Sequence, residues 1–362
     1  MKRVCYIVAN TPPPSLGWHT RARGIRAEQL AAHARMWFDE VRYVLFLERF
    51  NALRAERGFA ILAGARDDTT LISVDAFEPF ADRIEPATFV FTQIDFAEQA
   101  EYAAERHTIV YDILSLSELT LKQTGATESE LHHFRVQHQK MLRLASRTIV
   151  NGQKSAQWLA DDLRGVDVRI APFAPAPSLL PERERTHLLF GGPLPRWTDV
   201  TPLFRAMSGY LASNCVPTIM LAPAGQNEDA NALEYSALWL MGHVTAMWNL
   251  SACNDAEVLA RSFGYVDWAP LTMARAYSTS LRTLQAVAAG VPVLHQRDTA
   301  LDFLWDRFPG ERLDHPITAD DVARFVERAK AGHYRDAVAA ARNVLLTCRN
   351  DPAPLADLRA CA

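Results

Sequence analysis

Two patterns of hydrophobic and polar positions alternate along most of the chain. Short, mostly apolar runs that do not alternate with polar residues, such as "RVCYIVAN" at 3–10 and "TIVYDIL" at 108–114, are typical of strands buried on both faces of a parallel sheet. Longer segments with apolar residues at helical spacing lie between them, for example at 19–40. The repeated order of strand, helix and strand predicts βαβ units.

This reading gives a series of elements in each half of the chain. In the first half we expect strands at 3–10, 41–47, 69–74, 87–93, 108–114, 147–152 and 166–173, and helices at 19–40, 98–107, 129–145 and 153–163. After the stretch 171–186, which is rich in proline and charged residues, the alternation restarts with a strand at 187–192, a helix at 199–212 and a strand at 217–223. Further elements follow at 232–241, 243–249, 256–262 and 263–270.

The segment 278–296, "STSLRTLQAVAAGVPVLHQ", places three hydroxyl residues before a short stretch of helical periodicity. Ser278, Thr279 and Ser280 can accept the unpaired amides at the start of a helix, and Gly290 suits the position just after its end. One interpretation is a capped core helix followed by the strand "VPVL". The other is a ligand site, because ligands of open α/β domains bind beyond the carboxyl ends of the strands, where helix amides attract phosphates.

Charge, cysteine content and hydropathy argue against several classes of function. The net charge of −4 gives no general attraction to nucleic acid or to an anionic membrane. The five cysteines are scattered and form no C-x-x-C pair, so neither a disulfide framework nor a zinc site is indicated, and a cytoplasmic protein is expected. The longest apolar region falls short of the roughly 20 residues that span a bilayer, so any membrane association would be peripheral, at the inner face.

Several catalytic signatures are also missing from the sequence. It contains no Asp-x-Asp, no H-E-x-x-H, no G-x-G-x-x-G after the first strand and no Gly-x-Ser-x-Gly. These absences argue against a metal-dependent GT-A site, a zinc protease, a dinucleotide oxidoreductase and a hydrolase of the α/β type. No metal site is expected.

Two stretches resemble the donor domain of GT-B glycosyltransferases, in particular the family called glycosyl transferases group 1. "SLRTLQAVAAGVPV" is similar to a divergent branch of that family, and "LLFGGPLPRWTDVTPLFRAM" at 188–207 is similar to the strand and loop that open its nucleotide-sugar domain. Members commonly carry Glu-x7-Glu, where this chain has Tyr277 and Gln285. At the arginine and lysine that usually clamp the diphosphate, this chain has Pro193 and Thr198, which leaves Arg196 as the nearby cation.

The resemblance implies an α/β fold of the GT-B class, with two Rossmann-like doubly wound domains facing each other across a cleft. We expect an acceptor-binding domain at 1–172, a linker at 173–186, a nucleotide-sugar domain at 187–340 and a segment at 341–362 that returns towards the first domain. The implied activity is that of a hexosyltransferase. It moves a sugar from a nucleotide-diphosphate donor to an acceptor hydroxyl without a metal and with retention of configuration.

Site residues follow from the same resemblance and from their position at strand ends. The expected catalytic residues are Asp112, Arg196 and Arg282; the donor residues are Gly17, Gly192, Trp197, Ser278, Thr279, Ser280, Thr283 and Gln285; the acceptor residues are Trp18, His19, Arg21 and Glu118. Asp112 has an alternative as a cap of the following turn, and Trp197 as a core residue.

The expected partners are a nucleotide sugar, which serves as co-substrate in the absence of any further cofactor, and a glycan, lipid-linked or small-molecule acceptor. Because both family glutamates and the diphosphate clamp are replaced, a non-catalytic GT-B subunit that binds a partner transferase or a glycan stays open. A nucleotide-sugar epimerase of the same fold is a third possibility.

Overall fold

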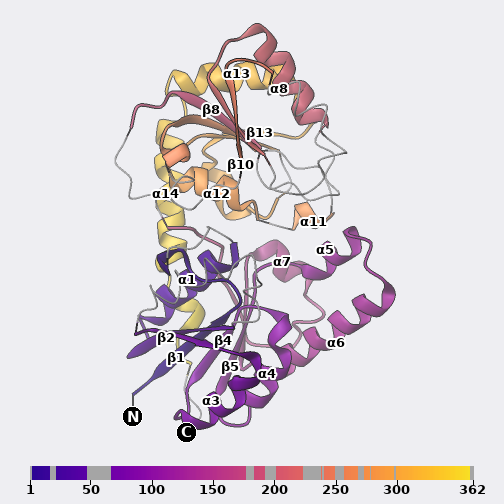
Figure 1. Cartoon of the computed structure of the whole chain (residues 1–362), viewed down its shortest axis with the longest axis vertical. Helices are drawn as coiled ribbons and strands as arrows, with labels where there is room; N and C mark the ends of the chain where they lie inside the picture. Colours follow the sequence, from indigo (N-terminus) through magenta and orange to yellow (C-terminus); the bar gives the residue numbers. More distant parts are fainter. Residues whose placement is uncertain are drawn as a thin grey trace. The chain divides into compact units, whose positions relative to one another are not determined.

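Two parallel sheets, one in each of two units, form the frame of the structure. The computed structural model describes residues 2–16, 22–46, 67–176, 183–191, 201–222, 238, 240–248, 257–267, 273–277, 279–296 and 299–358. Unit 1 comprises Met1–Pro175 and Thr347–Ala362, and unit 2 comprises Ala176–Leu346. Helix α14 (Arg335–Asn350), yellow in Figure 1, carries the chain from unit 2 back into unit 1.

Unit 1 is built on a parallel sheet with the strand order β3-β2-β1-β4-β5-β6-β7. Its strands are β1 (Val4–Ala9), β2 (Glu40–Phe46), β3 (Thr69–Ile72), β4 (Thr88–Phe91), β5 (Thr108–Ile113), β6 (Arg147–Val150) and β7 (Val168–Ile170). Every described pairing is parallel. The strand order reverses direction between β1 and β4, which makes this edge the switch point of a doubly wound sheet.

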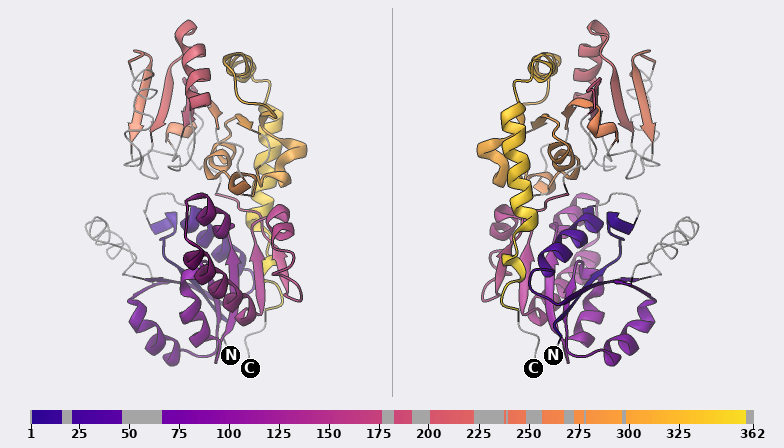
Figure 2. Two further views of the ribbon diagram at one scale, coloured as in Figure 1. Left: turned by 90° about the vertical axis from the view of Figure 1, so that its right-hand side faces the viewer. Right: turned by 90° about the vertical axis from the view of Figure 1, so that its left-hand side faces the viewer.

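Helices cover both faces of this sheet. They are η1 (Pro14–Leu16), α1 (Ala22–Ala34), η4 (Val74–Ala76), α3 (Phe77–Arg83), η5 (Ile94–Phe96), α4 (Ala97–Ala103), α5 (Ser117–Gln123), α6 (Glu128–Leu144), α7 (Gln153–Trp158) and η7 (Ala353–Leu355). α4 packs against both α3 and α6, whereas α1 packs against β1, β2 and η7. The side views of Figure 2 show the sheet between these two layers.

The core of unit 1 has two parts, one on each face of the sheet, because successive side chains of a strand point to opposite faces. In β4, Phe89 and Phe91 join an aromatic cluster with Phe77 from α3, while Val90 between them belongs to the aliphatic core that contains Leu30 of α1. Successive side chains of a strand point to opposite faces, so both sets are buried only because helices cover both faces. This explains why the strands read as continuous apolar runs.

The C-terminal segment is held to unit 1 through backbone carbonyls. Trp37 donates its indole N–H to the Pro352 carbonyl at 2.8 Å, and Gln29 and His33 both reach the carbonyl of Cys348. Glu28 on α1 pairs with Arg349 at 3.5 Å. α1 therefore binds the chain segment that arrives along α14.

Unit 2 repeats the architecture with the strand order β10-β9-β8-β11-β12-β13. Its strands are β8 (His187–Gly191), β9 (Thr218–Ala222), β10 (Val244–Trp248), β11 (Ser262–Val266), β12 (Val293–Gln296) and β13 (Gly310–Leu313). Its described helices are α8 (Thr201–Ser213), α11 (Met273–Ala276), α12 (Leu281–Ala288), η6 (Asp302–Arg307) and α13 (Ala319–Lys330). α8 packs on α13 over one face of the sheet, and the switch point lies between β8 and β11.

The sequence prediction of alternating parallel α/β units is confirmed, with differences at particular elements. α3, α5, α13 and β13 were not predicted, and the first predicted helix ends at Ala34 instead of continuing to residue 40. α3 contains a proline, and α5 is only seven residues long, so neither gives a sustained helical period.

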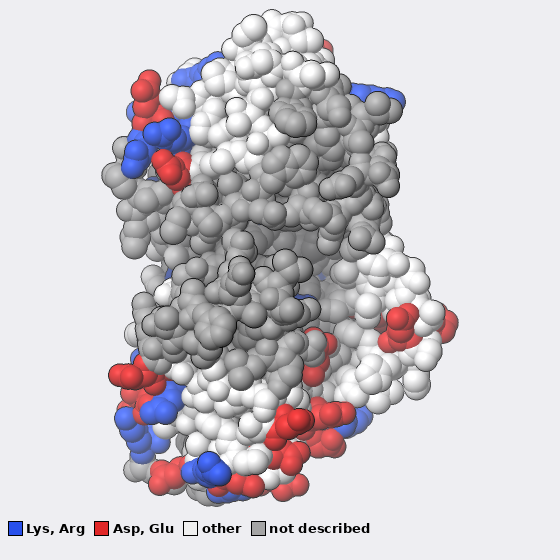
Figure 3. All heavy atoms as spheres, in the orientation of Figure 1, with Lys and Arg blue, Asp and Glu red and all other residues white. Residues whose placement is uncertain are grey.

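The surface of unit 1 seen in Figure 3 carries acidic side chains over α3 and α4. The exposed acids on these two helices are Glu78, Asp82, Glu98 and Glu101. Among the described residues, no helix is both long and apolar enough to cross a bilayer.

Candidate functional site

The switch point of unit 2 is organised around helix α12. Ser280 is its N-cap, and its hydroxyl accepts the Thr283 amide at 3.4 Å. At the other end, Gly290 (φ 78°) donates to the Val287 carbonyl, and Val291 donates to the Ala286 carbonyl, which is a Schellman motif. The predicted N-cap and the predicted C′ glycine of this segment are therefore confirmed.

A buried polar network connects this helix start to the ends of two strands. Asp267, which directly follows β11, accepts the Thr283 hydroxyl at 2.6 Å and lies 2.7 Å from Nδ1 of His295 on β12. Since an ionised carboxylate only accepts, Nδ1 of His295 carries the proton of that contact. Nε2 of His295 lies 2.8 Å from the Thr299 hydroxyl. Asp267 thus fixes β11, β12 and α12 relative to one another.

The same network reaches the end of β8. The hydroxyl of Tyr265 donates to the Gly191 carbonyl at 2.9 Å and lies 3.3 Å from Asp267. Gly191 has φ 87°, and a Cβ on it would stand 2.7 Å from the Leu221 carbonyl oxygen. Only glycine fits this position at the end of β8.

The predicted donor residues differ in burial, and several of them lie outside the described part of the chain. Ser280 and Thr283 are buried and serve the helix cap and the Asp267 network, while Thr279 and Arg282 are half-buried and Gln285 is buried on α12. The predicted residues Gly17, Trp18, His19, Arg21, Gly192, Arg196, Trp197 and Ser278 lie outside the described residues.

Sequence reasoning missed Asp267, Tyr265 and His295. Their signal was present in "FGYVD" and "VPVLH", because a polar residue that directly follows a buried strand stands at the carboxyl edge of the sheet. Nothing in the sequence showed that these two strands are neighbours.

In unit 1, Asp112 lies in the interior at the end of β5. Both Asp112 and Arg26 of α1 have fully buried side chains, and Nη2 of Arg26 is 2.6 Å from Oδ1 of the carboxylate. Arg26 also donates to Gln29 at 3.1 Å and to the Ala171 carbonyl at 2.8 Å. The residue at the N-cap of α5 is Leu116, so Asp112 does not cap that helix.

The charge of Arg26 also affects His33, which lies on the same helix. Burial, and then the charge of Arg26, lowers the pKa of His33 to about 4. Its Nε2 is 3.2 Å from the Cys348 carbonyl. The buried face of α1 therefore carries the neutral imidazole of His33 and the guanidinium of Arg26, whose charge is balanced by Asp112.

The switch point of unit 1 carries a second polar cluster. Asn10 after β1 and Gln93 after β4 exchange reciprocal amide hydrogen bonds. Arg23 in the first turn of α1 donates to Gln93 Oε1 at 3.0 Å. Gly24 lets the helix approach the preceding loop, since a Cβ there would stand 2.2 Å from the Pro12 carbonyl oxygen.

The predicted acceptor residue Glu118 lies on α5, where it pairs with Lys122 and Arg135 at 2.9 Å each. Helices α5 and α6 border a cavity of about 610 Å³ whose lining includes Asp95 and Glu130. Among the described residues, no group of His, Cys, Asp and Glu side chains is arranged to hold a metal ion.

Comparison with solved structures identifies the fold. The chain is similar to sucrose-phosphate synthase from Thermosynechococcus elongatus, with 15% identity and a TM-score of 0.64 over 98% of this chain and 96% of that chain. It is also similar to Anabaena HepE in complex with UDP and glucose, with 12% identity and a TM-score of 0.67 over 99% and 100% of the two chains. Trehalose-6-phosphate synthase OtsA matches with 9% identity and a TM-score of 0.63 over 97% of each chain.

These similarities span both units, and with the two doubly wound sheets they confirm the predicted GT-B fold. No protein-family model and no curated protein sequence matches the chain.

Proposed function

We propose that this protein is a glycosyltransferase that takes a sugar from a nucleotide-diphosphate donor bound at the switch point of unit 2. The observation that carries the proposal is the Asp267 network, which fixes the N-terminus of α12 beside the ends of β8, β11 and β12. In open α/β sheets this is the edge where ligands bind. The HepE structures with UDP and UDP-glucose belong to proteins of the same fold.

In this proposal the donor diphosphate lies against the first turn of α12. Helix amides and the half-buried Arg282 would neutralise the departing nucleotide, as a leaving diphosphate requires. Arg196, Trp197, Gly192 and Ser278 are proposed to complete the donor site from the adjoining segments. Gln285 would hold the ribose without a charge. Metal independence follows from the resemblance and from the lack of an Asp-x-Asp motif.

The acceptor would bind to unit 1. We assign this role to the polar edge of Asn10, Gln93 and Arg23, together with the adjoining segment 17–21 and Glu118. Asp112 then has a positioning role, because its carboxylate is buried against Arg26, which lies three residues after Arg23 on α1. The transfer would retain the anomeric configuration, as the resemblance implies.

The test combines binding and turnover. UDP-, GDP- and dTDP-sugars are screened for thermal stabilisation, since a ligand at 100 times its Kd adds about 2.7 kcal/mol to the free energy of unfolding. The stabilising sugar nucleotide is then incubated with glycan, lipid-linked and small-molecule acceptors, and nucleotide release is measured with and without acceptor. Acceptor-dependent release is the expected result.

A matched pair of helix-cap variants localises the donor. Ser280→Ala and Thr318→Ala each remove an N-cap hydroxyl in unit 2, and each should cost about 1 kcal/mol of stability. Only Ser280 is at the switch point, so only its loss should weaken nucleotide binding. Equal effects of the two variants on nucleotide affinity would place the donor elsewhere.

One observation favours a second candidate. Tyr277 and Gln285 stand where the family carries its two glutamates, and Gln285 is buried. A non-catalytic subunit would bind the nucleotide sugar or a glycan and release no nucleotide with any acceptor. Conversion of the sugar nucleotide in the absence of acceptor would instead indicate an epimerase.

A further inference from the structure

Unit 2 contains a cavity at the end of its sheet opposite to the proposed donor site. The cavity has a volume of about 530 Å³, and Phe263, Pro292 and Arg185 contribute to its lining. Phe263 is near the start of β11, Pro292 directly precedes β12, and Arg185 comes shortly before β8. The cavity therefore lies at the amino ends of the strands, whereas Asp267 and Gly191 lie at the carboxyl ends.

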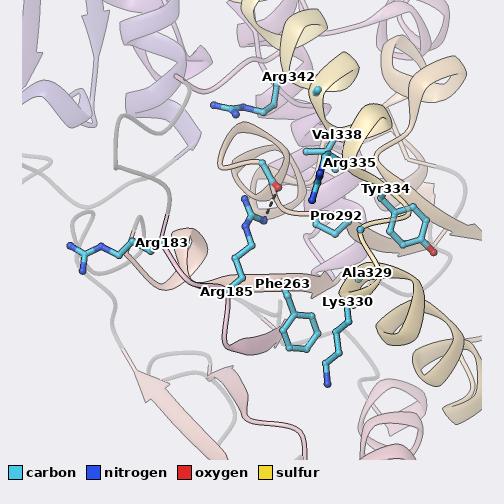
Figure 4. Close-up of a pocket in the computed structure, with 13 residues that line it drawn as sticks. Arg183, Arg185, Phe263, Pro292, Ala329, Lys330, Tyr334, Arg335, Val338 and Arg342 are labelled. Atoms are coloured by element: carbon cyan, nitrogen blue, oxygen red, sulfur yellow. Dashed lines mark hydrogen bonds between the residues drawn. The ribbon is translucent and has the colours of Figure 1, made fainter.

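The lining of this cavity is strongly cationic. It includes Arg183, Arg185, Lys330, Arg335 and Arg342, and no aspartate or glutamate is among its described residues. Figure 4 shows these side chains, which come from the segment before β8, from the end of α13 and from α14. The chain as a whole has a net charge of −4, so the accumulation is local and opposite in sign to the average. We call these five residues the basic cluster.

Helix α14 contributes one continuous face to the cavity. Arg335, Val338, Ala339 and Arg342 line it and are spaced i, i+3, i+4 and i+7, which places them on the same side of a helix. The two arginines are thus separated by two turns, roughly 10 Å along the axis, with an apolar strip between them. This face offers a positive charge at each end of a hydrophobic surface.

Two guanidinium groups approach each other at the end of α12. A Cβ placed on Gly290 would be 3.1 Å from Nη2 of Arg185 and 3.6 Å from Nη1 of Arg342. Arg185 has a structural reason to be there, because it donates to the carbonyls of Gly290 at 2.7 Å and Ser262 at 3.2 Å. Those bonds do not involve Arg342, which brings a second positive charge to the same place.

Among the described residues, no carboxylate pairs with Arg335 or Arg342. Tyr334 lines the cavity, but its hydroxyl donates to Glu311 at 2.5 Å. That carboxylate is already paired with Arg324 and Arg328 at 3.1 Å each. Lys330 lies 5.1 Å from the ring centroid of Phe263, which supplies an aromatic surface beside the cations.

We infer that the basic cluster is a second anion site, which binds a small molecule carrying two phosphate groups or two phosphate-like charges. Arginines match phosphate oxygens with paired donors, and two charges held at opposite ends of a helix face fit a ligand with more than one anionic group. The cavity volume lies in the range of about 300–1,000 Å³ typical of small-molecule sites. The inference does not depend on the proposed glycosyl transfer, since it uses none of the donor-site residues.

The direct test is calorimetric titration of the full chain with pyrophosphate at constant ionic strength. We expect saturable binding whose affinity falls at least about ten-fold, or about 1.4 kcal/mol, in the double variant Arg335→Gln/Arg342→Gln. Arg342→Lys keeps the charge and should retain part of the affinity. Arg164→Gln makes the same charge change at a surface arginine of unit 1 that is 82% exposed, and it should leave binding unchanged.

A second arm separates a free phosphate compound from a lipid headgroup. Vesicles of phosphatidylcholine with or without phosphatidic acid are sedimented with each variant. Pyrophosphate binding that requires Arg335 and Arg342 supports a free ligand, and binding only to phosphatidic acid vesicles with the same requirement supports a headgroup. Pyrophosphate and vesicle binding that is absent, or equal in wild type and the double variant, would overturn the inference.

Discussion

The buried ion pair between Arg26 and Asp112 allows a quantitative test of how unit 1 is held together. Asp112→Ala removes both carboxylate oxygens that accept from Nε and Nη2 of Arg26. Only Nη1 keeps its partners, Gln29 and the Ala171 carbonyl. Because both side chains are fully buried, water cannot replace the lost acceptor without opening the core.

The expected cost is large because a buried charge loses its counterion. Removing one partner of a buried pair typically costs about 3–5 kcal/mol, against a total stability of roughly 5–15 kcal/mol for a domain. An apolar replacement of both partners, Arg26→Met/Asp112→Leu, should recover much of this loss, since it leaves no buried charge. The exposed pair of Arg164 and Asp161 is the control, and Asp161→Ala should cost less than about 1 kcal/mol.

The assay is urea unfolding of the full chain, followed by circular dichroism and by tryptophan fluorescence. With a slope of about 2 kcal/mol per molar urea, Asp112→Ala should lower the midpoint of the unit 1 transition by roughly 1.5–2.5 M. A shift below about 0.5 M, or a double variant as unstable as the single one, would refute this account of the ion pair. If Asp112 instead contacted the acceptor, its loss would abolish transfer with the unfolding midpoint unchanged.

Three further predictions concern one buried histidine and two glycines at which a side chain would clash with a nearby backbone carbonyl. The pKa of His33 is about 4 in the folded chain, below its usual 6.5, so the unfolded chain binds the additional proton between these values. Stability should therefore be complete above pH 6.5 and fall by about 3 kcal/mol towards pH 4, and His33→Gln should flatten that slope in urea titrations across this range. Gly191→Ala should cost about 1–3 kcal/mol, because the new Cβ meets the Leu221 carbonyl in a left-handed conformation, and nucleotide affinity should fall with it in calorimetry. Gly24→Ala should lower the melting temperature, because a Cβ would stand 2.2 Å from the Pro12 carbonyl oxygen; an unchanged melting temperature would contradict the close approach of α1 to its loop.

The sequence by itself determined the class of architecture. Runs such as "TIVYDIL" are mostly apolar on both faces, and a strand with that composition is stable only when helices cover both faces of its sheet. Such strands alternate with segments of helical period in both halves, so the chain had to form parallel α/β layers. The capping of α12 was also local, since Ser280 and Gly290 make their hydrogen bonds within a few residues of themselves.

Tertiary structure alone decided which distant residues meet. Asp267, Thr283 and His295 are separated by up to 28 positions, and their contact depends on β11 and β12 being neighbours in the sheet. Local periodicity carries no information about strand order, and a hydroxyl that looks available to a ligand in the sequence, as in Thr283, is used inside the fold. The same holds for Asp112, whose partner lies 86 residues away on α1. The basic cluster likewise depends on tertiary structure, because α14 passes the amino ends of strands that begin roughly 40 to 155 positions earlier in the chain. No sequence pattern linked its arginines to Arg185.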